Sequence, residues 1–345
     1  MPIAWDEIPL PWGKRTSPAP RVAKNAASFE QNENNVIVSS DRLTVTIDKK
    51  TGYLSSIKDK DVQWLQSPMT LNFWRPTTNN DEGAKLDHKL KVWQYAGQRA
   101  KAVNVTAAQE GSDVVVKAEL SIPAANSKAN ITYRITGAAQ LMIETSFMPD
   151  KGLPTIPRIG YQAMISNNAA NLEWYGKGPQ ETYNDRQAGS WTTVHTGYIP
   201  NLFFRYADPQ ESGNHFGIRW ATLSALDVGK ILRIDATGDH LLELGAYPCK
   251  AADITLASHP SSIVMRDQYS MQIDHRHSGL GGTDSWGATA LPQYQIPSNQ
   301  NVQWSYMLTF NEVPIPPRRP MPNLPNLPPG LKLPDAPKAP TPPQK

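Results

Sequence analysis

Three polar, glycine-containing segments interrupt the strand pattern of this sequence and hold the residue types best suited to chemistry. They are FWRPTTNNDEG (73–83), WYGKGPQETYNDR (174–186) and DHRHSGLGGTDSWG (274–287). Loops that join the strands of a rigid β scaffold are common places for binding groups. We therefore treat these segments as the candidate site, although each of them also has a purely structural interpretation.

The first segment has the composition of a polyol-binding loop. The ring of Trp74 could stack on a sugar face, while Arg75, Asn80 and Asp81 could hydrogen-bond its hydroxyl groups. The alternative is a surface loop whose asparagines and aspartates satisfy their own backbone. Composition alone leaves both interpretations open.

The second segment holds two carboxylates. Glu181 and Asp185 could form the pair used in glycoside chemistry, which needs carboxyl groups ~5–5.5 Å or ~6.5–9.5 Å apart. An ion pair with Arg186 is the commoner use of such residues. The Gly-x-Gly in this segment lacks the longer glycine motif and the βαβ context of a nucleotide site.

The third segment holds two histidines and a tryptophan. His275 and His277 are two residues apart, so on a strand they would face the same side and could bind a metal or act as a general base. A structural role for both is the alternative. Trp286 lies between Ser285 and Gly287, whose small side chains could present its ring at a loop tip; the alternative is a buried core tryptophan.

The elements that position these segments are β-strands. Apolar and polar residues alternate in 42–47, a polar turn ending in Gly52 follows, and a second strand at 53–57 completes a hairpin. The same pattern predicts strands at 114–120, 130–135, 141–147, 216–223, 230–236, 253–258 and 302–310. Helical stripes are nearly absent, so we predict an all-β sandwich.

Composition narrows the class of protein. The 345 residues include 39% hydrophobic residues, and 34 basic against 31 acidic residues give a net charge of +3. This balance fits a globular protein and does not indicate a nucleic-acid or membrane surface. The single cysteine, Cys249, excludes an intramolecular disulfide and a cysteine-cluster zinc site. We see no secretory signal, so we expect a cytoplasmic location.

The three segments, in this order, resemble the C-terminal small-chain domain (domain 5) of the family-two glycoside hydrolase β-galactosidases. The first resembles W-R-A/P-x-T-D-N-D-x-G, with Asn79 where aspartate is usual. The second resembles W-x-G-x-G-P-x-E-x-Y-x-D-R, and the third resembles D-x-R-x-x-G-V/I/L-G-G-D/N/T-D-S-W. With the 42–57 hairpin and the step at 157–160, the resemblance extends from about Val36 to Phe310.

The resemblance implies a supersandwich of two stacked antiparallel sheets, of the galactose-mutarotase-like type. It also implies four parts: a remnant of a preceding β-sandwich strand at 1–12, a linker at 13–35, the supersandwich at 36–311 and a proline-rich tail at 312–345. Thirteen of the 31 prolines lie in that tail, which we expect to be disordered. Of the site residues, the resemblance implies substrate binding by Trp286, with Asp284 and Ser285 beside it, and further loop contacts by Arg75, Asn80, Asp81, Glu181 and His277.

The resemblance places the catalytic residues outside this chain. In the family, both catalytic glutamates belong to a TIM barrel, which takes ~200 or more residues, and this sequence has no parallel βα periodicity. We therefore expect a large β-galactosidase subunit or an upstream barrel domain as partner, a galactoside as substrate, and an oligomer. We expect no cofactor or metal on this chain, whereas the whole enzyme would use magnesium and sodium.

Three functions are consistent with these observations. The chain could be the small subunit or final domain of a retaining β-galactosidase that cleaves terminal β-D-galactosides such as lactose, inactive alone. It could instead be a non-catalytic carbohydrate-binding or assembly module. Least favoured is an aldose mutarotase that uses His275 or His277 with a carboxylate such as Glu181 as acid and base.

Overall fold

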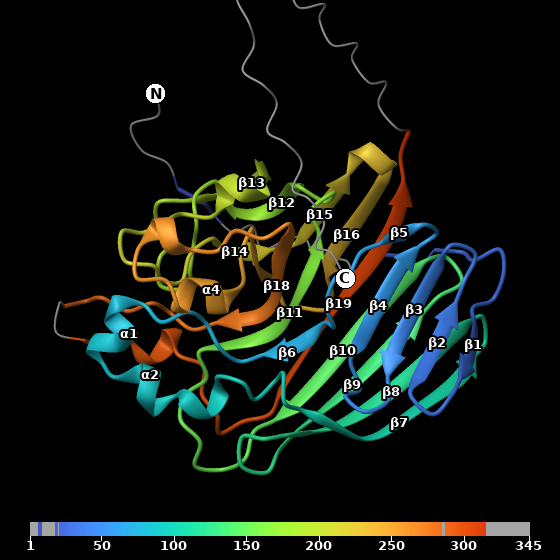
Figure 1. The fold of residues 1–345 in the computed structure, drawn as a ribbon, viewed down its shortest axis with the longest axis horizontal. Coiled ribbons are helices and arrows are strands. Elements are labelled where there is room, and N and C mark those ends of the chain that lie inside the picture. Colours follow the sequence, from blue (N-terminus) through green and yellow to red (C-terminus); the bar gives the residue numbers. More distant parts are fainter. Residues whose placement is uncertain (1–5, 9–17, 20, 285–286, 315–345) are drawn as a thin grey trace, which may run out of the picture.

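The chain folds into two stacked β layers in which every strand pairing is antiparallel (Figure 1). The computed structural model describes residues 6–8, 18–19, 21–284 and 287–314. Most of the predicted strand remnant at 1–12 and of the proline-rich tail at 312–345 therefore lies outside the described residues. No helix in the described ranges is long and apolar enough to span a bilayer.

One layer is a nine-stranded sheet in the order β13-β12-β15-β16-β19-β10-β9-β8-β7. In chain order its strands are β7 (Lys101–Glu110), β8 (Asp113–Ile122), β9 (Ser127–Ile135), β10 (Gln140–Met148), β12 (Asn171–Gly178), β13 (Trp191–Tyr198), β15 (Trp220–Ala225), β16 (Lys230–Ala236) and β19 (Val302–Glu312).

Two five-stranded sheets form the other layer. The first runs in chain order through β1 (Ser28–Gln31), β2 (Asn35–Ser39), β3 (Leu43–Asp48), β4 (Leu54–Asp59) and β5 (Val62–Gln63). The second has the order β14-β17-β18-β11-β6, with β6 (Thr70–Asn72), β11 (Arg158–Ser166), β14 (Asn214–Ile218), β17 (Leu242–Tyr247) and β18 (Gln268–His277). Isolated bridges, Leu54 to Met69 and Leu65 to Ile165, join their edges. The predicted supersandwich of two stacked antiparallel layers is thereby confirmed.

Helices are short and lie in the connections. They are α1 (Asn79–Gly83), α2 (Leu86–Lys89), α3 (Ile199–Leu202) and α4 (Ala251–Thr255), with 3₁₀ turns at Lys91–Trp93, Leu226–Val228, Pro260–Ser262 and Pro292–Tyr294.

Alternation decides which face of each strand is buried. In β3, Leu43, Val45 and Ile47 are fully buried, while Thr44 and Thr46 between them are only half-buried. The predicted strands at 114–120, 130–135, 141–147, 230–236 and 302–310 are confirmed as β8, β9, β10, β16 and β19.

Three sequence predictions of local structure differ from the observed fold. The strand predicted at 253–258 is wrong: the segment begins in helix α4, because the Asp253 carboxylate accepts the Lys250 N–H (2.8 Å) at the helix start, and Leu256 is 85% exposed. The strand predicted at 216–223 is two strands in different sheets, β14 and β15, because the chain bends at Arg219 between them; Gly217, with φ +70°, lies in an irregular part of β14. Strand β1 falls inside the predicted linker 13–35 and pairs with β2, so the folded domain starts before residue 36.

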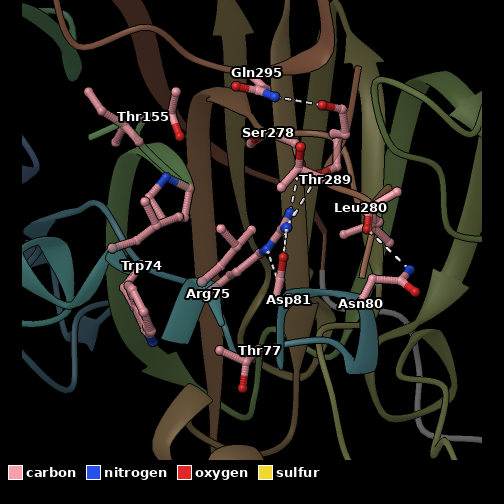
Figure 2. A pocket seen from close by; sticks show the side chains of 17 residues that line it. Trp74, Arg75, Thr77, Asn80, Asp81, Thr155, Ser278, Leu280, Thr289 and Gln295 are labelled. Atoms are coloured by element: carbon pink, nitrogen blue, oxygen red, sulfur yellow. Dashed lines mark hydrogen bonds and ion pairs between the residues drawn. The ribbon is translucent and has the colours of Figure 1, made fainter. Parts of the chain in front are cut away.

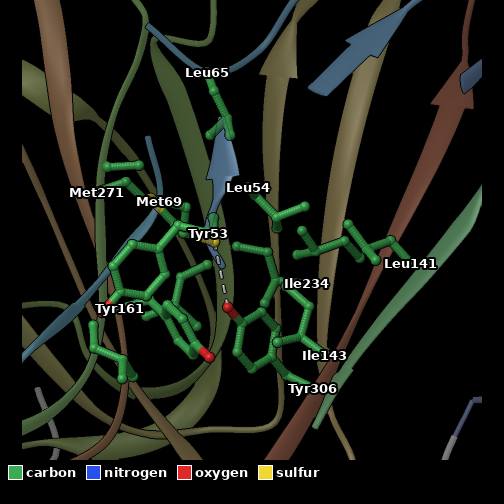
Figure 3. Packing of buried hydrophobic residues seen from close by; sticks show 14 of the residues in the cluster. Tyr53, Leu54, Leu65, Met69, Leu141, Ile143, Tyr161, Ile234, Met271 and Tyr306 are labelled. Atoms are coloured by element: carbon green, nitrogen blue, oxygen red, sulfur yellow. Dashed lines mark hydrogen bonds between the residues drawn. The ribbon is translucent and has the colours of Figure 1, made fainter. Parts of the chain in front are cut away.

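Buried tyrosines connect the two layers while satisfying their hydroxyl groups. The Tyr161 hydroxyl hydrogen-bonds Thr145 on the opposite layer (2.6 Å), and the Tyr306 hydroxyl points at the Met69 sulfur (3.5 Å) (Figure 3). Tyr133 donates to the Gly52 carbonyl at 3.0 Å. The apolar core therefore has fixed cross-layer contacts, and a pairing of the layers in another register would leave these polar groups unsatisfied.

A cluster of three buried aromatic rings packs the connection after β6 against the nine-stranded sheet. Phe147 of β10 lies with its ring centroid 4.6 Å from that of Phe73 and 6.1 Å from that of Trp93. Phe73 follows β6, and Trp93 ends the 3₁₀ turn at 91–93. This cluster fixes the first site segment to the nine-stranded sheet, because Phe73 is the first residue of that segment.

Replacing Phe147 by alanine should destabilise the fold. Loss of a fully buried phenylalanine that contacts two aromatic rings costs about 3–5 kcal/mol in free energy of unfolding. Urea unfolding of Phe147→Ala measures this cost, with Tyr198→Ala on β13, where the side chain is 48% exposed, as control. A loss as small as that of the control would contradict the packing described.

Candidate functional site

The three sequence segments meet at one end of the two-layer structure. The first follows β6, the second contains the end of β12, and the third contains the end of β18. Strand β11 pairs with both β6 and β18, which brings the first and third segments side by side. The ring of Tyr183 in the second segment lies 5.2 Å from that of His277 in the third.

Arg75 ties the first segment to the third (Figure 2). Its buried guanidinium forms a two-pronged ion pair with Asp81, with Nε to Oδ2 at 3.1 Å and Nη2 to Oδ1 at 2.8 Å. The same group donates to the carbonyl oxygens of Ser278 (2.7 Å) and Gly279 (3.2 Å). One planar cation therefore fixes both a helix and the start of the glycine-rich loop.

The first segment satisfies its own backbone, as its interpretation as a surface loop predicts, and it also makes contacts outside itself. Asp81 accepts the Thr78 N–H (3.0 Å) and Thr78 Oγ1 accepts the Asp81 N–H (3.1 Å), so the segment caps its own helix α1. Asn80 nevertheless reaches outward, and its Nδ2 donates to the Leu280 carbonyl at 3.3 Å. The segment thus satisfies its own backbone and also holds the third segment.

The second segment holds the same loop from the other side. Tyr183 and Arg186 exchange backbone hydrogen bonds, which makes a tight turn around Asp185. The Asp185 carboxylate accepts the N–H groups of Leu280 (3.0 Å) and Gly281 (2.8 Å), and Arg186 donates to the Gly281 carbonyl (3.2 Å). The expected Asp185–Arg186 ion pair is therefore wrong, because both side chains bind the loop instead.

Glu181 does not lie free for catalysis. Its carboxylate accepts a hydrogen bond from the Tyr206 hydroxyl and another from the Gly213 N–H at 2.8 Å. Within the described part of the chain, no contact joins it to His275 or His277. The acid–base pairing that a mutarotase would need is not assembled by these contacts.

Glycines permit this close packing. A Cβ on Gly279 would lie 2.7 Å from Cγ of Asp185, and a Cβ on Gly287 would lie 2.3 Å from the carbonyl carbon of Gly83. Gly287 also has a φ of +87°, a conformation that other residues rarely adopt. The glycines at positions 279 and 287 of the third segment therefore have a packing reason.

A buried polar cluster lies beneath the loop. Arg158 of β11 forms an ion pair with Asp274 (Nε to Oδ2, 2.9 Å) and donates from Nη2 to Glu211 (3.0 Å), and all three side chains are almost completely buried. Glu243 of β17 accepts the N–H of His277 at 2.9 Å. The last residue of β18 is thereby fixed just before the loop begins.

Burial shifts the pKa values of this cluster in opposite directions. Burial raises the pKa of Glu243 to about 7, and burial beside Arg158 lowers the pKa of His277 to about 4. Burial would also raise the pKa of Glu211, but the adjacent Arg158 guanidinium outweighs it and holds that pKa below its ordinary value.

His275 and His277 do not face the same side, so that prediction is wrong. The β11–β18 pairing has a bulge between Ile159 and Gly160, which breaks the alternation at this point of β18. His275 stacks on Trp304 with ring centroids 5.6 Å apart, whereas His277 lies against Tyr183 and Glu211. A pair of histidines for metal or base chemistry is therefore absent here.

The substrate-binding residues implied by the resemblance are only partly described. Asp284 is exposed, and its Oδ1 accepts the Ala288 N–H at 3.1 Å. Ser285 and Trp286 lie outside the described residues. Contacts of substrate with these three residues, and with Arg75, Asn80, Asp81, Glu181 and His277, remain predictions.

A small cavity of about 100 Å³ lies beside the Arg75–Asp81 pair (Figure 2). Residues of the first and third segments line it, including Trp74, Asn80 and Leu280. Sites for small molecules are larger, roughly 300–1,000 Å³. The described residues at this end of the molecule therefore form a wall and not a complete sugar pocket.

Sequence reasoning did not select Arg158, Glu211 and Glu243 as site residues. Glu243 carries the clearest signal that was available, because Leu242 and Leu244 flank it and a carboxylate inside an apolar strand needs a buried partner. Among the described residues, no group of three or more His, Cys, Asp or Glu is placed to hold a metal ion. Glu211 and Asp274 already bind Arg158, which suits them poorly as metal ligands.

Asp185→Ala should loosen the loop. The substitution leaves the N–H groups of Leu280 and Gly281 without their acceptor, so their hydrogen exchange should accelerate about five- to a hundredfold, equivalent to about 1–3 kcal/mol. Amide hydrogen exchange measures this, with Asp208→Ala, an exposed aspartate, as control. Unchanged exchange at 280–281 would contradict the anchoring role of Asp185.

Glu243→Gln should change how stability depends on pH. Since folding raises the pKa of Glu243 from 4.5 to about 7, its stabilising contribution is full below about pH 4.5 and is lost as pH rises through 7. Glutamine does not titrate, so relative to the wild type the variant should gain about 2–3 kcal/mol in free energy of unfolding between pH 5 and pH 8. His277 titrates in both proteins, so its contribution to the pH dependence of the free energy of unfolding cancels in the comparison.

Urea unfolding at the two pH values measures this difference. Glu119→Gln, at an exposed carboxylate of β8, controls for the substitution itself. Parallel pH profiles of Glu243→Gln and wild type would show that Glu243 does not retain its proton in the folded chain.

Comparisons with known proteins agree on the family. The family described as beta galactosidase small chain matches residues 39–308. A β-galactosidase of Priestia megaterium is 31% identical over 315 residues, which are 91% of this chain and 30% of that protein. A β-galactosidase of Lactobacillus delbrueckii subsp. bulgaricus is 27% identical over 297 residues, or 83% of this chain and 29% of that protein.

Solved structures of similar shape are remote in sequence. A galactose mutarotase-like protein from Clostridium acetobutylicum aligns with 84% of this chain and 99% of its own, at a TM-score of 0.48 and 10% identity. Galactose 1-epimerase from Lactobacillus acidophilus aligns with 84% of this chain and 100% of its own, at a TM-score of 0.46 and 9% identity.

The chain spans about 30% of the length of the two curated relatives described above. Its three signature segments meet in one place, and the family match covers most of its residues. This chain therefore belongs to the β-galactosidase small-chain family.

Proposed function

We propose that this chain is the small subunit or final domain of a β-galactosidase and forms one wall of its galactoside pocket. The observation that carries the proposal is the anchoring of the third segment. Arg75 and Asn80 hold its first residues from one side, and Asp185 and Arg186 hold them from the other.

This anchoring suits a residue that must present an aromatic ring to a sugar. Ser285 and Trp286 are preceded by the anchored residues 278–281 and followed by Gly287, which packs against Gly83. A binding group works best when packing and hydrogen bonds around it fix its position in advance. The indole of Trp286 would offer an apolar platform to the C–H face of a pyranose.

The rest of the pocket would come from a partner. The small cavity of about 100 Å³ at this site cannot enclose a sugar, and the relatives are roughly three times longer than this chain. Both facts support a large subunit or upstream barrel domain that supplies the two catalytic glutamates of a retaining mechanism. That partner would also bind the magnesium and sodium.

In this arrangement the chain contributes binding and not bond cleavage. Its loop would stack on the aglycone side of a terminal β-D-galactoside such as lactose and exclude water from that side of the pocket. The galactoside, the oligomeric state and the cytoplasmic location belong to the same proposal.

Trp286→Ala in the assembled enzyme should raise KM for a nitrophenyl β-galactoside ten- to a hundredfold. The physical reason is the loss of one stacking contact, about 1–3 kcal/mol. Steady-state kinetics of the assembled enzyme measure it. Trp191→Ala on β13, where the tryptophan is 43% exposed, is the matched control and should leave KM unchanged. Unchanged KM and kcat in Trp286→Ala would remove this tryptophan from the pocket.

A further inference from the structure

A second and larger hollow lies on the outer face of the β14-β17-β18-β11-β6 sheet. Its volume is about 450 Å³, within the range of roughly 300–1,000 Å³ that small-molecule sites occupy. Strands β6, β11 and β18 form its floor, with Thr70, Gln162 and Ser270 among the lining residues. Tyr161, which neighbours Gln162, points the other way into the core against Tyr306.

Two short segments form its walls. One is the turn that follows the 3₁₀ turn at 91–93 and contributes Gln94, Tyr95 and Gln98. The other is helix α4 with its flanking residues, from Lys250 to Leu256. We call this hollow the amide groove, because Asn72, Gln94, Gln98 and Gln162 all line it.

Three of the four amides of the groove are available for a ligand, whereas Asn72 Oδ1 already accepts the Trp74 N–H at 3.1 Å. Among the described residues, the side chains of Gln94, Gln98 and Gln162 make no hydrogen bond, and each offers two donors and one acceptor group. Sugar hydroxyl groups also donate and accept, so a primary amide can bind two neighbouring hydroxyls. Besides these amides, the polar side chains of the lining are mostly the hydroxyls of serine and threonine.

Charge in the groove favours a neutral ligand. Among the residues that the structure describes, no carboxylate lines it, and Lys250 is its one charged lining residue. A cationic ligand would therefore find no carboxylate partner in this lining. Tyr95 is 50% exposed and offers an aromatic ring at the wall, although the Arg99 guanidinium lies over that ring, 4.9 Å from its centroid, and brings a second cation close to the groove.

The walls are fixed before any ligand binds. Tyr53 donates to the Gly97 carbonyl at 2.8 Å, and a Cβ on Gly97 would lie only 1.8 Å from the Leu71 carbonyl oxygen, so the turn packs directly on β6. On the other side, Asp253 accepts the Lys250 N–H and pairs with Arg266. A preformed site of this kind loses little free energy to ordering on binding.

We infer that the amide groove is a second carbohydrate-binding site, which takes a neutral sugar of one or two residues. Trp74 lines both this groove and the small cavity beside the Arg75–Asp81 pair, but the inference does not depend on the proposed function. Planar amides, hydroxyls, a tyrosine face and the lack of negative charge together match the chemistry of such a ligand.

Titration of the isotope-labelled chain with lactose, followed by NMR chemical shifts, tests the inference. Saturable shifts should appear at groove residues such as Gln94 and Gln162. Gln162→Ala and Tyr95→Ala should each weaken binding about five- to tenfold, through lost hydrogen bonds and lost stacking. Thermal unfolding of each variant shows that it is folded.

Matched controls separate the groove from the rest of the surface. Gln303→Ala on β19 and Tyr198→Ala on β13 replace exposed residues outside the groove and should not change affinity. Trp286→Ala should also leave the groove shifts unchanged.

Three results would overturn the inference. They are no saturation with lactose at tens of millimolar, equal weakening by groove and control variants, and weakening by Trp286→Ala alone. The last result would place binding at the loop and leave the proposed function standing.

Discussion

The buried guanidinium of Arg75 is the contact on which the arrangement of this site depends. It neutralises the Asp81 carboxylate, and it also donates hydrogen bonds to the carbonyl oxygens of Ser278 and Gly279. Removing it would leave a buried carboxylate unpaired, a change that costs several kcal/mol. A helix capped by its own residues and a glycine-rich loop 200 residues away in sequence are thus held as one rigid unit.

The two-layer fold explains why segments so distant in sequence meet. Strand β11 lies between β6 and β18, so the ends of those strands emerge together, and β12 of the other layer delivers the turn that carries Asp185. Below them, the buried guanidinium of Arg158 forms ion pairs with Glu211 and Asp274. The fold thereby gives this end of the molecule a stiff surface, as the proposed role in a shared pocket would require.

Much of this could be predicted from sequence where the signal is local. Alternation in 42–47 predicts β3, and the three signatures identify the family because each is long and continuous. Contacts at long range were beyond reach: nothing near Asp185 indicates that it accepts N–H groups from residues 280 and 281. The bulge in the β11–β18 pairing separates His275 from His277, and it depends on the pairing partner, which the sequence of β18 alone does not reveal. Helix α4 forms where the sequence pattern predicts a strand, because the Asp253 carboxylate caps the helix start.

The account is tested most directly by mixing this chain with the barrel-bearing β-galactosidase polypeptide of the same organism and assaying hydrolysis of a nitrophenyl β-galactoside. Each polypeptide alone should be inactive or nearly so, and the mixture should gain full activity as a complex forms. Full activity of the barrel polypeptide without this chain, or hydrolysis by this chain alone, would contradict the claim that it completes a pocket whose catalytic groups lie elsewhere.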